Sequence, residues 1–529
     1  MNPARLPQLR NLLAILVLST GFIWSAWHVF NQRRADAPQG KIVLRIGHWL
    51  MNPGMREAFD EAIKDYEALH PEVRIEQILV PTRSYATWTR TQLIGETAPD
   101  ITGMLFLKEE LITRHFISLA DEVTKPNPYN TGTSLEGIPW RDTFVDGLDG
   151  SLGYTPTSGE HFGVNLQVNC LRLFYNRPLM LAITGRDTPP ATYAELRALG
   201  PLVDAYNRRK GRAIVPIASS GTYGGFLSDV LFSSQTQRHT LEHSPAGNLR
   251  FQQAEIAQTL LAGGLDLDGP EIRKGFSLVH DVSKLMQAGF DQLAAGDALF
   301  TYLQGNALMI YTGNWDNAVL KQEAGFPNGV THLPMPGRDD PDYGPNSLGL
   351  TSEATGGTEA LMGVVRNSRH PEVAIDFLHY LTSLRGAERF TKTSQRVSST
   401  VDTPQPPELK QLTPLLEGAL PGFSLSLPGF GGRNSTQAYM RNRHLLLGPN
   451  GDVDAFIARL KEDYLPALRE DFTHYVSRTR KETRSLDSLI GLHFSQHEDG
   501  SPGTGWSRLV ESQHRRQIES LTYQDLTAR

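Results

Sequence analysis

The sequence has little cysteine and no concentration of positive charge. Its 529 residues include one cysteine, Cys170, so no disulfide bond can form within the chain. The fold must therefore rest on its hydrophobic core in whichever compartment the protein resides. The net charge is −6, and no run of lysine and arginine exceeds three residues. Because nucleic-acid phosphates attract basic surfaces, this balance argues against a nucleic-acid partner.

The common motifs of catalysis and metal binding are also missing. The sequence contains no G-x-x-x-x-G-K-[ST], H-E-x-x-H or G-x-S-x-G motif and no zinc-binding pair of cysteines. His239 and His243 are four residues apart, which is more typical of a polar surface pair than of a metal site. We therefore expect a binding protein without cofactor or metal rather than an enzyme. A glycoside hydrolase is the enzyme alternative, because an acidic chain can hold two carboxylates at catalytic separation.

One long apolar run stands near the N-terminus, from Leu12 to Phe30, and it carries no charge. Its length is close to the roughly 20 residues that cross a bilayer as a helix. The A-x-A match to a signal-peptidase site, Ala35-Asp36-Ala37, follows two arginines and precedes Pro38, and no lipoprotein cysteine is present. We therefore predict an uncleaved transmembrane anchor at 12–30, between a cytoplasmic stretch at 1–11 and a linker at 31–40. A cleaved signal is the alternative, and basic residues on both sides leave the orientation open.

After the linker, strand and helix patterns alternate with short connections. Two β-branched runs, Ile42 to Gly47 and Val73 to Val80, enclose a helical pattern formed by Phe59, Ile63, Tyr66 and Leu69. Further strand patterns follow at Ala213 to Ser219, Ala307 to Gly313 and Gly329 to Met335. A later helix is expected to face a core with Ala374, Phe377, Leu378 and Leu381. This order predicts an α/β fold with parallel sheets.

The chain is too long for one hydrophobic core, so two lobes with appendages are expected. Proline and glycine cluster from Thr403 to Gly432 and predict an irregular surface segment. The stretch from Val453 to Val476 is amphipathic, and we expect a kink at Pro466. Its apolar stripe consists of Val453, Phe456, Ile457, Leu460, Tyr464, Leu468, Phe472 and Val476. The tail from about Arg484 is polar, with a weak helical pattern at Trp506 to Leu521.

Seven segments resemble those of a known family, in the same order. They are FDEAIKDYEALHPEVRIE (Phe59 to Glu76), GETAPDI (Gly95 to Ile101), HFISLADEV (His115 to Val123), LRLFYNRPLM (Leu171 to Met180), TPPATYAEL (Thr188 to Leu196), FTYLQGNALMIYTGNW (Phe300 to Trp315) with HLPMPG (His332 to Gly337), and GGTEALMGVVRNSRHPEVAIDFLHYLTS (Gly356 to Ser383). The series is similar to the family 1 extracellular solute-binding proteins, the maltose-binding-like receptors of ABC importers, over roughly residues 41 to 395. His115 replaces a usual glycine and Tyr193 a frequent tryptophan. The stretch from Val123 to Asn165 and everything after Arg396 are longer than the family pattern.

The resemblance implies a two-lobed α/β fold of the type II periplasmic-binding-protein class, behind an N-terminal transmembrane helix. Lobe 1 would contain residues 41–165 and 331–370, lobe 2 would contain 166–330 and 371–482, and 483–529 would be a polar C-terminal extension. A sugar or similar polar solute would bind in the cleft and favour closure, because it bonds to both lobes at once.

The same resemblance implies the partners and the location. ABC permease subunits would be the protein partners, and Leu12 to Phe30 would be the membrane contact. The lobes would face the periplasm or the cell exterior. A membrane-anchored sensor or scaffold with the same lobes is the alternative, in which the C-terminal segment would contact another protein.

Candidate ligand-binding residues follow from the chemistry of sugars, which offer apolar faces and a rim of hydroxyls. Trp49 follows the first strand at the end where α/β sheets bind ligands, and Asn52 lies in the same turn. Trp315 is the strongest candidate, because it combines a turn after a buried strand with the aromatic that similar proteins carry there. The remaining candidates are Asn314, Asp316, Tyr85, Trp140, Tyr223, Gly356 and Gly357. The alternatives are structural: core packing of the aromatics and helix capping by Asn52 and Asp316.

Overall fold

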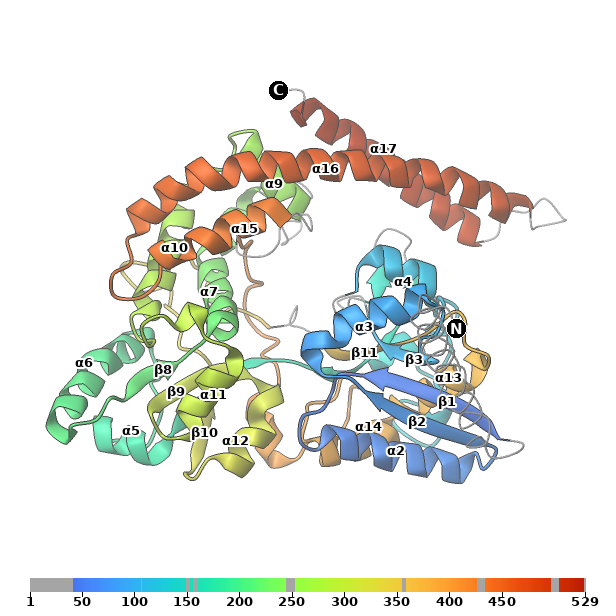
Figure 1. Ribbon diagram of the computed structural model, residues 1–529, viewed down its shortest axis with the longest axis horizontal. Helices are drawn as coiled ribbons and strands as arrows, with labels where there is room; N and C mark the ends of the chain where they lie inside the picture. Colours follow the sequence, from blue (N-terminus) through green and yellow to red (C-terminus); the bar gives the residue numbers. More distant parts are fainter. Residues whose placement is uncertain are drawn as a thin grey trace, which may run out of the picture.

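The computed structural model describes residues 41–105, 107–148, 153–155, 160–243, 253–353, 358–425, 433–495 and 504–527. Two α/β lobes lie side by side, and a pair of long helices runs across them (Figure 1). The span expected at Leu12 to Phe30 lies outside the described residues. Within the described ranges, no helix combines the length and apolar character needed to cross a membrane.

The first lobe is built on a five-stranded sheet with the order β2-β1-β3-β11-β6. Its strands are β1 (Ile42–His48), β2 (Val73–Leu79), β3 (Ile101–Gly103), β6 (Val164–Val168) and β11 (Thr358–Val364). β1 pairs in parallel with β2 and β3, whereas β11 is antiparallel to β3 and β6. The two strands predicted from β-branched runs are therefore confirmed, whereas the prediction of a wholly parallel sheet is wrong, because β11 enters from the other lobe in the opposite direction. The sheet is completed only when the chain returns from the second lobe.

The helices of this lobe bury one face each against the sheet or against one another. They are α2 (Met55–Leu69), α3 (Thr82–Ile94), α4 (Glu109–His115), α13 (Pro371–Leu381) and α14 (Leu384–Ser394). In α2 the predicted face of Phe59, Ile63 and Tyr66 is buried. Leu69 is 60% exposed, contrary to the expected stripe, because it is the last residue of the helix. α14 packs along α2, where the rings of Phe59 and Phe390 lie 5.0 Å apart between centroids.

The second lobe is built on a sheet with the order β10-β7-β9-β8. Its strands are β7 (Leu171–Asn176), β8 (Val215–Ala218), β9 (Ala307–Gly313) and β10 (Asn328–Thr331). β8 pairs in parallel with β9, and β7 is antiparallel to β9 and β10. Every residue of β9 is buried, as expected for a central strand that is covered on both faces. The turn that follows β9 therefore leaves the middle of the sheet.

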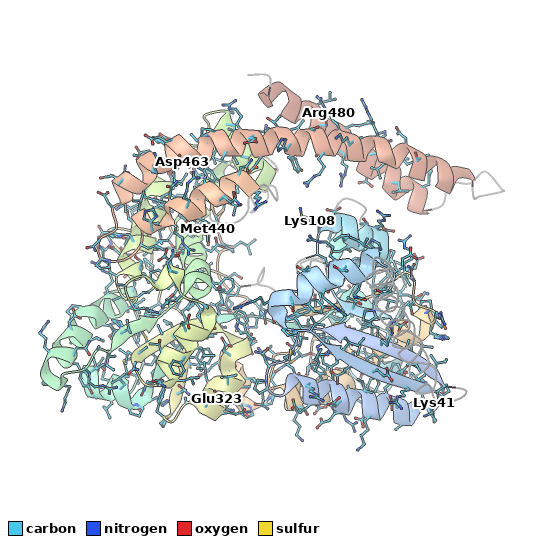
Figure 2. All side chains as sticks on the ribbon, in the orientation of Figure 1. Lys41, Lys108, Glu323, Met440, Asp463 and Arg480 are labelled. Atoms are coloured by element: carbon cyan, nitrogen blue, oxygen red, sulfur yellow. The ribbon has the colours of Figure 1, made fainter. Side chains whose placement is uncertain are left out.

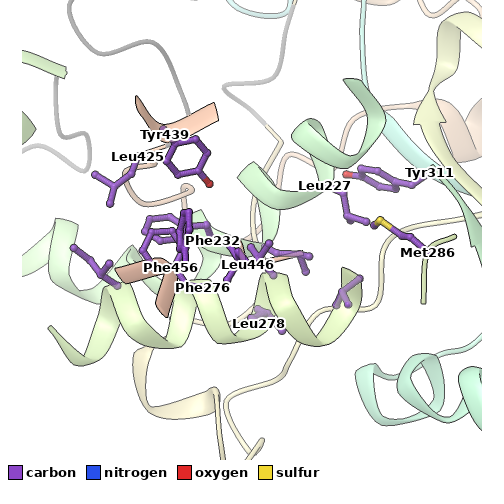
Figure 3. Close-up of a cluster of buried hydrophobic side chains, with 14 of the residues drawn as sticks. Leu227, Phe232, Phe276, Leu278, Met286, Tyr311, Leu425, Tyr439, Leu446 and Phe456 are labelled. Atoms are coloured by element: carbon purple, nitrogen blue, oxygen red, sulfur yellow. The ribbon is translucent and has the colours of Figure 1, made fainter. Parts of the chain in front are cut away.

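Helices surround this sheet and pack into two hydrophobic cores, a larger one and a smaller one that contains Ala298, Tyr302 and Leu320. They are α5 (Arg177–Thr184), α6 (Tyr193–Lys210), α7 (Gly221–Gln235), α8 (Gln237–His243), α9 (Gln253–Leu261), α10 (Pro270–Ser283), α11 (Ala295–Leu303) and α12 (Asn317–Glu323). Figure 3 shows Phe232 of α7 and Phe276 of α10 in the larger core, and their ring centroids lie 4.8 Å apart. The core continues into the C-terminal part of the chain.

The described part of the C-terminal region contains the helices α15 (Arg433–Asn442), α16 (Val453–Ser495) and α17 (Thr504–Thr527). The apolar stripe predicted for Val453 to Val476 is confirmed, since Phe456, Leu460 and Phe472 are fully buried in the core of the second lobe. α16 continues helically through Pro466 and far beyond Val476. The polar tail is thus mostly helical, and its two helices lie against each other (Figure 1).

Short elements connect these parts. A small hairpin joins β4 (Tyr154–Thr155) to β5 (Glu160–His161). The 3-10 turns are η2 (Pro128–Asn130), η3 (Trp140–Thr143), η4 (Phe290–Gln292), η5 (Asn314–Asp316), η6 (Gly344–Asn346), η7 (Pro407–Leu412) and η9 (Arg443–Leu445).

Among the described residues, the chain changes lobe at three places, after β6, before β11 and after α14. In the third crossing, Val397 and Ser399 hydrogen-bond to the backbone of β6. The packing differs from the lobe boundaries expected at 331 and 371. Tyr343 belongs to the core of the second lobe, whereas α13 and α14 contribute Phe377 and Phe390 to the core of the first. Residues 332–353 thus pack with the second lobe, and residues 371–394 pack with the first.

Candidate ligand-binding site

Trp315 lies in the turn that follows β9, with its indole ring over the backbone of Gly313. A Cβ atom at Gly313 would come within 2.1 Å of the ring, so this position accepts only glycine while the ring keeps its place. The ring is partly exposed and meets Phe226 of α7 edge to face, with centroids 6.0 Å apart. Phe226 is 38% exposed. The second lobe therefore presents a pair of accessible aromatic rings at this turn.

The backbone of Trp315 is held from two directions. Its carbonyl oxygen accepts a hydrogen bond of 2.6 Å from Nη2 of Arg396, which stands at the start of the third crossing. It also accepts one of 3.4 Å from Nδ2 of Asn52, in the loop after β1 of the first lobe. The residue before Arg396, Gln395, adopts a left-handed conformation with φ 54° at the end of α14 and directs the chain into the crossing. Trp315 therefore stands where both lobes and a crossing meet.

Asp316 and Tyr223 form a buried network behind Trp315. Oδ2 of Asp316 accepts hydrogen bonds from the hydroxyl of Tyr223 at 2.7 Å and from that of Thr312 at 2.6 Å. Burial raises the pKa of Asp316, although hydrogen bonds and the charge of Arg396 oppose this shift. The network joins the first turn of α7 to the end of β9. It therefore fixes the position of the two elements that carry Phe226 and Trp315.

Asn314 lies on the other side of the turn and is 1% exposed. Its Nδ2 donates a hydrogen bond of 2.8 Å to the carbonyl oxygen of Val168, at the end of β6. Its Oδ1 is buried and has no partner among the described residues. Asn314 thus connects the turn of the second lobe to the first crossing.

Three candidate aromatics instead lie in the core of the first lobe. Trp49 is 5% exposed and packs on Tyr85, whose hydroxyl lies 2.9 Å from the carbonyl oxygens of both Gly47 and Gly103. Trp140 is fully buried, and its Nε1 donates to the hydroxyl of Thr382 at 2.9 Å. The packing alternative accounts for all three side chains. Gly356 and Gly357 lie outside the described residues.

The structure brings Asn52, Asn314, Trp315, Asp316 and Tyr223 together. It adds two residues that the sequence analysis did not select, Phe226 and Arg396. Phe226 lies three residues after Tyr223 on the same helix, so helical spacing carried a signal for it. Arg396 is an isolated arginine in a loop, and nothing in its local sequence marks it. Within the described ranges, no group of three metal-ligating side chains lies close enough to hold an ion.

The two-lobed chain can be compared with known proteins. A profile of the bacterial extracellular solute-binding protein family matches residues 61–415, whereas no curated protein matches the chain in sequence. Unliganded RafE from Streptococcus pneumoniae is 16% identical, with a TM-score of 0.55, over 82% of this chain and 100% of RafE. RafE in complex with raffinose is 17% identical, with a TM-score of 0.55, over 81% of this chain and 100% of that one.

A third solved structure agrees in fold. The cyclic α-maltosyl-1,6-maltose binding protein from Arthrobacter globiformis is 16% identical, with a TM-score of 0.53, over 81% of this chain and 99% of that one. At such low identity these structures support the two-lobed fold alone. The family profile covers most of both lobes. The resemblance seen in the sequence is thereby confirmed, and the chain belongs to the bacterial extracellular solute-binding protein family.

Proposed function

We infer that this solute-binding protein captures a sugar between its lobes, beside Trp315, and delivers it to an ABC-type importer. The observation that carries this proposal is the accessible pair of aromatic rings, Trp315 and Phe226, on the second lobe. The backbone carbonyl of Trp315 also accepts a hydrogen bond from Asn52 of the first lobe. An aromatic face beside polar groups from two lobes suits a molecule with apolar C–H faces and a rim of hydroxyls. The sugars named for RafE and the Arthrobacter protein support the same ligand class.

Closure of the lobes around the sugar follows from the way the chain is connected. A sugar that contacts Trp315 and the loop of Asn52 together completes hydrogen bonds that neither lobe offers alone. The sugar therefore stabilises the closed arrangement, in which it contacts both lobes, because it binds that arrangement more tightly than the open one. Arg396 lies in the third crossing and donates a hydrogen bond to the carbonyl oxygen of Trp315, so hinge rotation and the position of Trp315 are connected through one side chain.

The proposed location follows from the N-terminal sequence and from the family. The uncharged run from Leu12 to Phe30 has the length of a bilayer span and would anchor the receptor without cleavage. The lobes would then face the periplasm or the cell exterior, where ABC permease subunits collect the solute. Tethering would keep the receptor close to its transporter at a high effective concentration.

A thermal-shift screen of the full chain in detergent tests the ligand class. A ligand at about 100 times its dissociation constant adds roughly 2.7 kcal/mol to the free energy of unfolding. We expect oligosaccharides such as raffinose to raise the melting temperature, and amino acids or peptides to leave it unchanged. A shift caused only by a non-sugar solute would contradict the proposal, as would release of monosaccharides from a bound oligosaccharide.

A further inference from the structure

The C-terminal hairpin, defined here as α16 (Val453–Ser495) and α17 (Thr504–Thr527), is fixed to the second lobe at its base. Phe456 of α16 meets Phe276 of α10 edge to face, with centroids 5.0 Å apart, in the core drawn in Figure 3. Tyr464, Leu468 and Val476 follow in the same core. Asp471 accepts backbone hydrogen bonds from Asn434 and Ser435 and so caps α15. The first half of α16 therefore moves with the second lobe.

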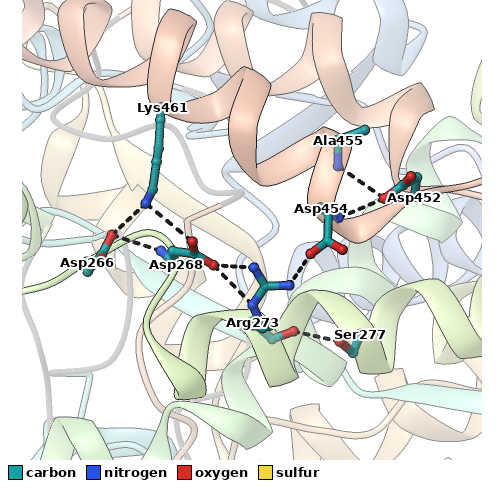
Figure 4. A network of polar contacts seen from close by, with 8 residues as sticks. All are labelled: Asp266, Asp268, Arg273, Ser277, Asp452, Asp454, Ala455 and Lys461. Atoms are coloured by element: carbon teal, nitrogen blue, oxygen red, sulfur yellow. Dashed lines mark hydrogen bonds and ion pairs between the residues drawn. The ribbon is translucent and has the colours of Figure 1, made fainter.

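Charged side chains fix the same base from outside (Figure 4). Arg273 of α10 pairs with Asp268 and with Asp454 in the first turn of α16. Further along α16, Lys461 lies 3.2 Å from Asp266 and 3.5 Å from Asp268. These exposed contacts add to the buried stripe in holding the base of α16 against the second lobe.

Beyond Val476 the hairpin leaves this core. α16 continues to Ser495, which at 1.5 Å per residue is roughly 30 Å of helix. α17 returns along it, and Gln513 donates to the carbonyl oxygen of Thr483 at 3.3 Å. Figure 1 shows the hairpin passing from the second lobe across to α4 of the first. In Figure 2 Arg480 marks α16 above Lys108, the residue before α4.

The hairpin touches the first lobe through an ion pair. Nη2 of Arg516 on α17 lies 3.7 Å from Oε1 of Glu109 in the first turn of α4. The arginine side chain is 16% exposed and the glutamate 45%, so the pair is partly shielded from solvent. A contact between an element of one lobe and an extension of the other depends on how the lobes are arranged.

We propose that the C-terminal hairpin is a strap that holds the lobes in the arrangement seen here and must release α4 before they can close. α17 moves with the second lobe and α4 with the first, while the three crossings lie elsewhere. Rotation about the crossings therefore displaces Glu109 from Arg516 and breaks a contact made at this separation. The strap would contribute to the free-energy difference between the two arrangements, and through it to the apparent affinity for solute. This proposal rests on the proposed function in one respect only, namely that the two lobes move relative to each other.

Interlobe distances measured by pulsed electron spin resonance test the strap without any sugar. Spin labels would be placed on cysteines introduced at Arg90 of α3 and Met440 of α15, which are exposed positions on the two lobes. The natural Cys170 is buried, and burial raises the pKa of its thiol to about 12, so it would stay unlabelled. Because no ligand is needed, failure to find a sugar would leave this test valid.

We expect Arg516→Glu to shift the distance distribution toward shorter values. Glu109→Gln should cause the same shift from the side of the first lobe, with the hairpin itself unaltered. Joining Arg516→Glu to Glu109→Arg should restore the original distribution. The matched control is Ser507→Glu, which adds a carboxylate at an exposed position of the same helix and should leave the distribution unchanged.

Salt gives a second route to the same release. In about 1 M salt, where the Debye length is roughly 3 Å, the unmodified chain should resemble the single variants. Distributions that are identical in the unmodified chain and in both single variants would overturn the proposal.

Discussion

Nδ2 of Asn52 lies 3.4 Å from the carbonyl oxygen of Trp315 and donates a hydrogen bond to it, although 263 positions separate the two residues in sequence. One belongs to the loop after β1 of the first lobe and the other to the turn after β9 of the second. The bond engages the backbone of Trp315 and does not involve its indole ring, which packs on Gly313 and remains partly exposed. The position of the ring is therefore set by the turn, whereas the face of the ring can serve a ligand.

Truncation of Trp315 should cost the fold little. The ring is partly exposed, and its backbone is held by Asn52 and Arg396. We expect Trp315→Ala to lower the free energy of unfolding by about 1–2 kcal/mol, because few core contacts are lost. The matched control is Trp140→Ala, which empties a fully buried site and should cost about 3–5 kcal/mol. Urea unfolding of both variants compares them, and equal losses would assign Trp315 to the core.

The two bonds to the carbonyl oxygen of Trp315 should differ in strength. Arg396 is a buried charged donor at 2.6 Å, whereas Asn52 is a partly exposed neutral donor at 3.4 Å. Hydrogen bonds with a charged partner are worth about 1.5–3 kcal/mol and neutral ones about 0.5–1.5 kcal/mol. We expect Arg396→Lys to destabilise the protein more than Asn52→Ala does. Denaturant unfolding measures the free energy of unfolding of both variants. A larger loss for Asn52→Ala than for Arg396→Lys would contradict this order.

Acid should destabilise the first lobe through buried histidines. The ring of His379 packs on Trp140 at 3.9 Å between centroids, and burial lowers its pKa from 6.5 to about 4. Between these values the unfolded chain binds the proton more readily than the folded one. The neutral His379 therefore contributes fully to the free energy of unfolding above pH 6.5. This contribution is lost as the pH falls toward 4, and for a shift of this size the loss is about 3 kcal/mol.

His379→Phe should reduce this loss, because phenylalanine keeps an aromatic ring beside Trp140 and takes up no proton. Melting temperatures measured from pH 7 to pH 4.5 would show a shallower decline for the variant. Some decline should remain, since burial also lowers the pKa of His48 to about 4. Parallel curves for the two proteins would exclude His379 as a source of acid sensitivity.

The full-length protein should remain with membranes. The run from Leu12 to Phe30 has the length of a span, and the candidate cleavage site at Ala35 to Ala37 is flanked by arginines and proline. A chain that starts at Lys41 should be soluble and keep the same melting temperature. Fractionation with intact-mass measurement decides between the alternatives: full-length protein in the soluble fraction with a shortened N-terminus would reveal a cleaved signal.

The strands and helices could be predicted because their signal is local. The β-branched run at Ile42 to Gly47 and the spacing of Phe59, Ile63 and Tyr66 identify strand β1 and the buried face of α2 within short windows of sequence. Lobe membership has no such signal. Phe377 of α13 packs with the first lobe and Tyr343 with the second, and only contacts distant in sequence decide this.

Site prediction was limited for a related reason. An aromatic residue after a strand looks the same in sequence whether it faces a ligand, as we propose for Trp315, or the core, as Trp49 and Tyr85 do. The close approach of Trp49 to Gly103 excludes it from the surface, and this depends on the pairing of β1 with β3. The sequence gives no sign of Arg396, because its partner, the carbonyl oxygen of Trp315, lies 81 positions away.

The central claim is that a sugar binds against Trp315 between the lobes, and calorimetric titration tests it most directly. Raffinose and other oligosaccharides from the thermal-shift screen would be titrated into the full chain and into Trp315→Ala. An aromatic anchor commonly contributes about 2 kcal/mol or more, which is more than tenfold in the dissociation constant. We expect saturable one-to-one binding to the unmodified protein and at least a tenfold weaker affinity for the variant. Equal affinities in the two proteins, or no binding of any sugar, would contradict the account.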